Sequence, residues 1–196
     1  MMQTKLIAMM MLLLPLAAQA QWPETGVRDK SRMAAHRTQL TLPNVRVIDS
    51  HQREHSLQTL LQDRVAVVNF VFTSCATVCP ALSGTMQVLQ QQLQQRLGEE
   101  VILVSVSVDP ARDTPEKLNT HAAKLGAGSD WYWLTGKTAE MNQLLKAFGI
   151  PAGRPEDHPP VILVGKANTG QWLRWVGIPA PETLTRAVTA LIHGDL

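Results

Sequence analysis

The fold of this chain is most constrained by two apolar, β-branched runs, Val65–Phe72 (VAVVNFVF) and Val101–Val108 (VILVSVSV). Runs of this kind are typical of strands that are buried on both faces of a sheet. Between them, leucines and a methionine recur every three or four residues from Cys79 to Leu97, which predicts an amphipathic helix. Two strands joined by one helix of ordinary length favour a right-handed crossover. The sequence therefore predicts adjacent parallel strands and an α/β fold.

Weaker patterns predict the rest of the sheet. A hairpin is expected around the polar turn Asp49–Arg53, and Thr114 followed by a proline is typical of a helix start. The other expected elements are a helical turn at Leu57–Leu61, helices at 115–125, 139–148 and 181–192, and strands at 131–134, 161–164 and 171–176. Strands that alternate with helices and end in a hairpin and a last helix predict a mixed sheet with helices on both faces, preceded by an N-terminal β-hairpin.

The N-terminus has the three parts of an export signal. Lys5 supplies a positive charge, Leu6–Leu16 is apolar, and Ala18–Ala20 (AQA) is a small-residue cleavage site. We therefore expect residues 1–20 to be a cleaved signal peptide and the mature chain to begin at Gln21. The protein would then be periplasmic or otherwise exported, and soluble after cleavage. A retained membrane anchor is the alternative, which the AQA sequence disfavours.

Two further segments follow the expected signal peptide. Residues 21–39 are polar and lack a sustained apolar period, so we interpret them as a flexible lead-in. Residues 40–196 are numerous enough to form one domain with a substantial core. The formal net charge is only +2 and aromatic residues make up 5% of the chain, which argues against a nucleic-acid partner. We expect no membrane span after signal cleavage.

The residues that carry chemistry gather at the junction of the first buried strand and the amphipathic helix. The chain's two cysteines, Cys75 and Cys79, lie here with three residues between them, and Pro80 stands at the first helical position. A helix N-terminus carries a partial positive charge that lowers a thiol pKa. Three intervening residues let both sulfurs face one point, so the pair can close a disulfide or hold a soft metal ion. A passive structural bridge, or two inert buried thiols, is the alternative.

A third ligand is sought among the six histidines. His158 is the best placed, because it precedes the strand expected at 161–164, beside the functional edge of an α/β sheet. A solvated loop histidine is the alternative. Two sulfurs and one imidazole suit Cu(I), and hold Cu(II) when oxygen ligands are added, whereas a structural zinc site needs four protein ligands. The remaining histidines are expected at the surface: His36, His51, His55, His121 and His193.

Three motifs, in the right order, resemble the Sco/SenC family of thioredoxin-like copper proteins. They are TSCATVCP at 73–80, DPARDT at 109–114 and DHPPVILV at 157–164. A C-x₃-C pair alone would be weak evidence, whereas the three motifs together are specific. The resemblance covers roughly residues 40–192.

This resemblance implies a thioredoxin fold and copper binding by Cys75, Cys79 and His158. It also implies a role in delivering copper to the Cu(A) site of cytochrome c oxidase, or in reducing the cysteines of that site. The partner would then be a copper-accepting protein, namely an oxidase subunit.

The chain departs from the family pattern in two places within these motifs. Family members commonly carry Pro-Asp between the cysteines, where this chain has Ala76-Thr77, and Ser or Thr after the histidine, where it has Pro159-Pro160. Thioredoxin-like reductases place a cis-proline opposite their active cysteines, and either of these prolines could supply it. The family also usually has a membrane anchor, whereas a cleaved signal is expected here.

Two functions fit these residues. The first is a copper metallochaperone that passes its ion to an acceptor by ligand exchange through shared sulfurs. The second is a thiol–disulfide oxidoreductase in which Cys75 attacks a substrate disulfide and Cys79 resolves the mixed disulfide, so that His158 is dispensable. A thiol peroxidase is disfavoured, because the P-x₃-T-x₂-C pattern is absent before Cys75.

Two other groups of residues are interpreted as structural. Asp109 and Asp113 follow a strand end and invite an acid–base role, but turn formation and helix capping explain them better. Four tryptophans on expected strands are assigned to packing rather than to substrate stacking: Trp131, Trp133, Trp172 and Trp175.

Overall fold

Strands and helices alternate along the chain in a computed structural model that describes residues 34–75, 79–151 and 153–195. In chain order they are β1 (His36–Gln39), β2 (Arg46–Asp49), β3 (Glu54–Ser56), α1 (Leu57–Leu61), β4 (Val65–Val71), α2 (Cys79–Gln92), β5 (Val101–Ser107), α3 (Pro115–Lys124), β6 (Trp131–Thr135), α4 (Thr138–Ala147), the short 3₁₀ helix η2 (Pro155–Asp157), β7 (Val161–Lys166), β8 (Gln171–Val176) and α5 (Pro181–His193). The expected signal peptide, residues 1–20, lies outside the described residues. None of the helices in the described part of the chain has both the length and the apolar character that crossing a bilayer requires.

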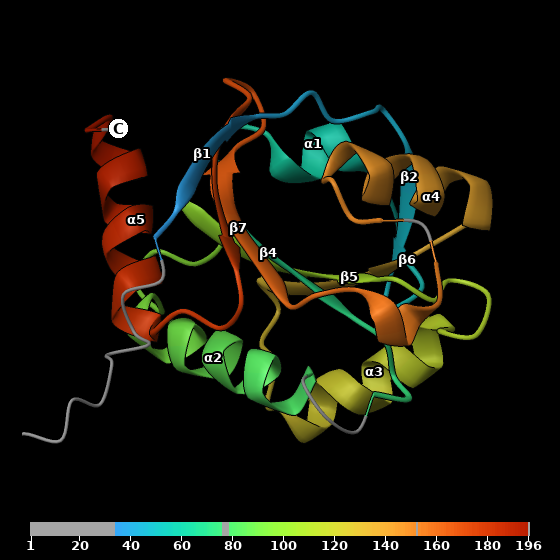
Figure 1. Ribbon diagram of the computed structural model, residues 1–196. Coiled ribbons are helices and arrows are strands. Elements are labelled where there is room, and N and C mark those ends of the chain that lie inside the picture. Colours follow the sequence, from blue (N-terminus) through green and yellow to red (C-terminus); the bar gives the residue numbers. More distant parts are fainter. Residues whose placement is uncertain (1–33, 76–78, 152, 196) are drawn as a thin grey trace, which may run out of the picture.

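The strands form a mixed sheet in the order β1-β8-β7-β4-β5-β6-β2-β3 (Figure 1). β4 and β5 are adjacent and parallel, with Val65 opposite Val101 and Val71 opposite Ser107. β6 continues the parallel part beyond β5, whereas the other strand pairs are antiparallel. The predicted parallel pair, hairpin and mixed sheet are therefore confirmed. β4 lies inside the sheet, and its carboxyl end leads into the cysteine segment.

Helices cover both faces of the sheet, because successive side chains of a strand point to opposite sides. In β4, Val67 and Val71 pack in the core that α2, α3 and α5 cover, whereas Val68 and Phe70 pack in the core that α1 and α4 cover. Figure 1 shows these two groups of helices on opposite sides of the sheet. The tryptophans assigned to packing are all buried, as predicted: Trp131, Trp133, Trp172 and Trp175.

Two boundaries differ from the sequence-based expectation. The expected lead-in, residues 21–39, is wrong at its end, because His36–Gln39 form β1 and pair with β8. β1 is an edge strand without a buried residue, so its sequence lacks the apolar alternation that signals a strand. Residues 21–33 lie outside the described residues. The helix expected over Cys79–Leu97 ends at Gln92, because the following residues turn toward β5.

The β2–β3 hairpin is built around Asp49, a residue only 1% exposed. Its Oδ1 accepts the backbone N–H groups of His51 (2.8 Å) and Arg53 (2.9 Å), and its Oδ2 accepts Arg53 Nε (2.7 Å) and His55 Nε2 (2.8 Å). Burial raises the pKa of the Asp49 carboxyl, but these hydrogen bonds, led by that of His55, outweigh burial and lower the pKa to about 2. The surface assignment of His55 is therefore wrong, because its ring is bound to a buried carboxylate.

Candidate thiol and metal site

The two cysteines meet at the carboxyl end of β4. Cys75 N–H donates to the carbonyl oxygen of Phe72 at 3.1 Å, so the chain turns as soon as the strand ends. Cys79 is the first residue of α2, and its N–H donates to Cys75 Sγ at 3.3 Å. The structure thus brings the sulfur of Cys75 to the N-terminus of α2, beside Cys79. Both are thiols here, so the expected disulfide stays a prediction.

The two thiols have different surroundings. Cys79 is buried, and burial, together with its side-chain hydrogen bond to Cys75, raises its pKa to about 12. The expectation that the helix N-terminus lowers a thiol pKa is therefore wrong for Cys79, because desolvation of the charged form outweighs the helix dipole. Cys75 is half-buried, and its sulfur accepts the backbone N–H of Cys79. Of the two cysteines, Cys75 is the better exposed to a partner.

A buried carboxylate fixes the loop that carries Cys75. Asp113, 2% exposed, accepts both the backbone N–H (3.1 Å) and the hydroxyl (2.6 Å) of Thr73 on Oδ1. Its Oδ2 accepts the hydroxyl of Ser107, the last residue of β5, at 2.6 Å. Asp113 is thus structural, as predicted, but the predicted helix capping is wrong, because its carboxylate binds Thr73 and Ser107 and the cap of α3 is Thr114. Sequence analysis missed Thr73 and Ser107, although a serine inside an otherwise apolar buried strand is a signal for a buried hydrogen bond.

His158 lies between η2 and β7, half-buried, with its ring edge-on to Phe72 at 6.1 Å between ring centroids. Its Nδ1 is 3.0 Å from the carbonyl oxygen of Pro159. Because a carbonyl can only accept, Nδ1 donates a proton in this contact, and in the neutral ring Nε2 is then the nitrogen available to a metal. The suggested cis-proline is absent: among the described residues no peptide bond is cis, those before Pro159 and Pro160 included.

The three predicted ligands are only partly assembled. The cysteines are in contact, and His158 touches Phe72, the residue to which Cys75 donates its N–H. Within the described residues, however, no group of three His, Cys, Asp or Glu side chains is close enough to hold a metal ion. The donor set of two sulfurs and an imidazole nitrogen fits a soft ion such as copper. A change in position of His158 or of the cysteine loop is needed to close that set around one ion.

The other histidines have different surroundings. His36, His51 and His193 are exposed, as expected. His121, on α3, is half-buried against Trp133, with 5.4 Å between ring centroids, and burial lowers its pKa. Its surface assignment is therefore wrong, because an aromatic neighbour on β6 partly covers it.

Two cavities lie at opposite ends of β4. One, of about 780 Å³, is lined by His158 together with Leu145, Lys146, Ile150 and Arg154.

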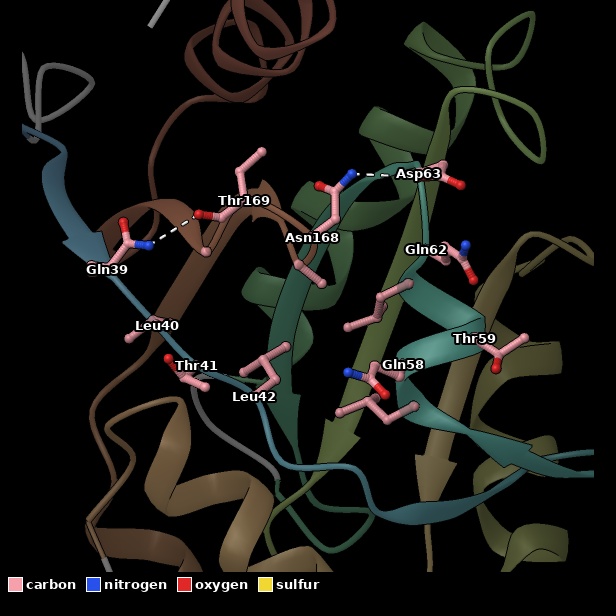
Figure 2. A pocket seen from close by; sticks show the side chains of 14 residues that line it. Gln39, Leu40, Thr41, Leu42, Gln58, Thr59, Gln62, Asp63, Asn168 and Thr169 are labelled. Carbon is pink, nitrogen blue, oxygen red and sulfur yellow. Dashed lines mark hydrogen bonds between the residues drawn. The ribbon is translucent and has the colours of Figure 1, made fainter.

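The other cavity, of about 630 Å³, lies beside the amino end of β4, between the segment after β1, helix α1 and the β7–β8 turn (Figure 2). Amide and hydroxyl side chains line it together with four leucines. Figure 2 shows two of its hydrogen bonds, from Gln39 Nε2 to the Thr169 carbonyl (3.0 Å) and from Asn168 Nδ2 to Asp63 Oδ1 (3.3 Å). None of the predicted site residues lines this second cavity.

A mixed sheet covered on both faces, with a pair of thiols where a central strand enters a helix, defines a thioredoxin-like thiol protein. The comparison with protein families makes this assignment specific. The SCO1/SenC family model matches residues 38–164, more than half of the chain, and the chain belongs to this family.

Individual relatives agree with the family assignment. A protein of Stutzerimonas stutzeri whose name refers to copper binding is 34% identical over 110 residues, which are 56% of this chain and 52% of that protein. The chain spans about half the length of the curated relatives it matches.

Solved structures share the fold. BsSco, described as a member of the Sco family of cytochrome c oxidase assembly proteins, superposes with a TM-score of 0.69 at 24% identity, over 82% of this chain and 98% of its own. Yeast Sco1 with copper bound gives a TM-score of 0.65 at 18% identity, over 80% of this chain and 91% of its own.

Proposed function

We propose that this chain is an exported copper metallochaperone that serves Cu(A) assembly of cytochrome c oxidase. The observation that carries the proposal is the contact of the two cysteines, with Cys79 N–H 3.3 Å from Cys75 Sγ at the start of α2. The family and the copper-bound yeast relative support copper as the cargo. The recipient in this proposal is a copper-accepting oxidase subunit.

Copper is held in this proposal by the sulfurs of Cys75 and Cys79 and by Nε2 of His158. Thiolates select soft ions, and a trigonal set of two sulfurs and one imidazole suits Cu(I). Binding displaces the proton of the buried Cys79 thiol, since a coordinating thiol is deprotonated by the metal. The more exposed Cys75 is the sulfur that a recipient reaches first, so transfer proceeds by exchange of ligands at that side.

Export is part of the proposal. Its support is the sequence of residues 1–20, with a positive charge, an apolar stretch and a small-residue cleavage site. In this proposal the mature chain begins at Gln21 and works in the periplasm or an equivalent compartment, as a protein without a membrane span.

Copper loading of single-site variants tests the function. The reduced mature protein is loaded anaerobically with Cu(I), passed through a desalting column with a competing chelator, and analysed for metal. We expect one copper per chain in the parent, and affinity lower by roughly a hundredfold or more in Cys75→Ala and Cys79→Ala, because losing a ligand costs more than losing an outer-shell partner.

The matched control for this experiment is Ser83→Ala, which removes a buried hydroxyl from the same helix, one turn beyond Cys79. We expect it to retain parental copper. Equal copper in the cysteine variants and the parent would overturn the proposal.

A thiol–disulfide oxidoreductase is the second candidate, and the unequal exposure of the cysteines favours it. Cys75 is half-buried and its sulfur accepts the N–H of Cys79, whereas Cys79 is buried. In this mechanism the Cys75 thiolate attacks a substrate disulfide and releases one substrate thiolate. Cys79 then attacks Cys75 Sγ, which releases the second thiolate and leaves a Cys75–Cys79 disulfide, and an external dithiol reductant restores the pair.

His158→Ala separates the two candidates. Cu(II) retention should fall severely, with a milder effect on Cu(I), which two thiolates can hold. Reduction of a small test disulfide should stay within about threefold of the parent, because exchange needs only the two sulfurs and their access. Unchanged Cu(II) retention together with robust reductase activity in the parent would favour the oxidoreductase.

A further inference from the structure

We propose that Asp113 is a positioning residue for Cys75, acting through Thr73. The proposal rests on the proposed function only in assuming that Cys75 is the working thiol. Asp113 holds the backbone from which Cys75 projects, through its hydrogen bonds to Thr73. The acid–base role considered from sequence is therefore replaced by a geometric one.

The contacts of Asp113 fix the Cys75 loop from outside the loop. Thr73, two residues before Cys75, gives Asp113 both its backbone N–H (3.1 Å) and its hydroxyl (2.6 Å). Two donors from one residue to one carboxylate oxygen restrain that residue in position and in rotation. The chain then turns through the hydrogen bond from Cys75 N–H to the Phe72 carbonyl. The start of the loop is thus tied to Asp113, and its end is tied to α2 by the contact of Cys75 Sγ with Cys79 N–H.

The other carboxylate oxygen connects this loop to the rigid part of the sheet. Ser107 Oγ donates to Asp113 Oδ2 at 2.6 Å and also accepts Asp109 N–H at 3.0 Å. Ser107 is fully buried and pairs with Val71, the last residue of β4. Asp113 therefore holds the segment that follows β4 in a fixed position relative to β5.

Helix capping does not account for Asp113. The N-cap of α3 is Thr114, whose hydroxyl accepts the N–H of Lys117. The carboxylate of Asp113 points instead to a residue 40 positions earlier in the sequence. A buried charge is costly unless hydrogen bonds compensate it, and here the donors come from the Cys75 loop and from β5.

A second buried network on β5 offers the matched comparison. Ser105 Oγ donates to Asn69 Oδ1 (2.7 Å) and accepts Trp131 Nε1 (2.9 Å), so it links β4, β5 and β6. Ser105 and Ser107 are two residues apart on the same strand and equally buried. The side chain of Ser105 thus binds β4 and β6, whereas that of Ser107 binds Asp113 and the Asp109 N–H. A general loss of stability therefore follows from changing either serine, whereas a change in Cys75 chemistry should follow only from the Asp113 network.

The test measures thiol chemistry in the metal-free, reduced protein. The pH profile of Cys75 alkylation by iodoacetamide, in a Cys79→Ala background, is recorded for Thr73→Val and Thr73→Ser, with folding checked by circular dichroism. We expect Thr73→Val to shift the alkylation rate at neutral pH by about five- to tenfold, the size of one ordinary lost hydrogen bond. Thr73→Ser keeps the hydroxyl and should stay within about twofold.

The serine pair completes the test. Ser107→Ala should move the alkylation profile in the same direction as Thr73→Val, and Ser105→Ala should leave it at the parental position while lowering the melting temperature. Should Thr73→Val not fold, Asp113→Asn takes its place. Parental profiles in Thr73→Val and Ser107→Ala, or equal shifts in Ser105→Ala, would overturn the proposal. Because no copper is present, failure of the copper-loading experiment leaves this result unaffected.

Discussion

The β2–β3 hairpin and the loop before Cys75 are each organised around a buried aspartate, yet the two carboxylates receive different donors. Asp49 is bound by groups within six residues of itself, including the side chains of Arg53 and His55. Asp113 is bound by the hydroxyl of Ser107 on β5 and by the hydroxyl and backbone N–H of Thr73 in the turn after β4. The first carboxylate stabilises its own turn, and the second joins parts of the chain that are distant in sequence.

The two aspartates show that a buried carboxylate can either stabilise a local turn or help to shape a functional site. A carboxylate held by an arginine and a histidine of its own hairpin affects the free energy of unfolding at the edge of the sheet. The Asp113 carboxylate, which accepts hydroxyl groups from β5 and from the cysteine loop, affects stability and also the position of the Cys75 sulfur. Equal burial therefore does not imply equal function; the segments that a buried group connects decide its role.

The largest effect is expected from removing the carboxylate at the site. Asp113→Ala leaves three donors without their acceptor, two on the half-buried Thr73 and one on the buried Ser107. We expect the free energy of unfolding to fall by about 3 kcal/mol, since each buried unsatisfied group costs on the order of 1 kcal/mol or more. The loss is measured from the shift of the urea unfolding midpoint, with the dependence of the free energy of unfolding on urea concentration unchanged. A fall below about 1 kcal/mol would show that the network contributes little and would break the comparison.

The hairpin carboxylate should instead give a pH dependence. The pKa of Asp49 is lowered in the fold from 3.8 to about 2, so folding favours its ionised form. The resulting stability is present above pH 4 and is lost as the pH falls toward 2, and it amounts to about 2 kcal/mol. Asp49→Asn should lack this dependence while loading parental copper. Unfolding midpoints from pH 5 to pH 2 compare the two chains, and identical pH profiles would contradict the assignment.

The smallest effect is expected at the polar cavity near the amino end of β4. Gln58 lines this cavity and is exposed. Gln58→Ala should change the free energy of unfolding by less than about 0.5 kcal/mol, because surface substitutions without buried partners rarely do more. Copper loading should equal that of the parent. A loss of copper in this variant would mean that the two ends of β4 are coupled, and would contradict the placement of the copper site at the carboxyl end alone.

Sequence reasoning succeeded where a signal is local. The alternating faces of β4 and β5, the cap of α3 by Thr114 and the adjacency of Cys75 and Cys79 all follow from residues near one another in the chain. It failed for His55, because the partner that binds its ring, Asp49, is recognisable only once the hairpin register is known.

The contacts of the site depend on the tertiary fold, which no local pattern encodes. The bond between Thr73 and Asp113 spans 40 residues, and no period in the sequence reports it. The thiol pKa of Cys79 was misjudged for a related reason: a helix start is visible in the sequence, whereas the depth at which the fold buries that start is not. The position of His158 relative to the sulfurs likewise depends on how the loop after η2 packs on Phe72.

β1 also affects how copies of this chain behave beside one another. The edge of a sheet presents unpaired N–H and C=O groups, which can recruit a strand from a neighbouring molecule. Without β1 that edge would be β8, with its apolar Trp172 and Trp175. With β1 the edge is four residues long, polar, and carries His36 and Arg37. The segment that looked like a lead-in thereby acts as a cover that discourages edge-to-edge aggregation.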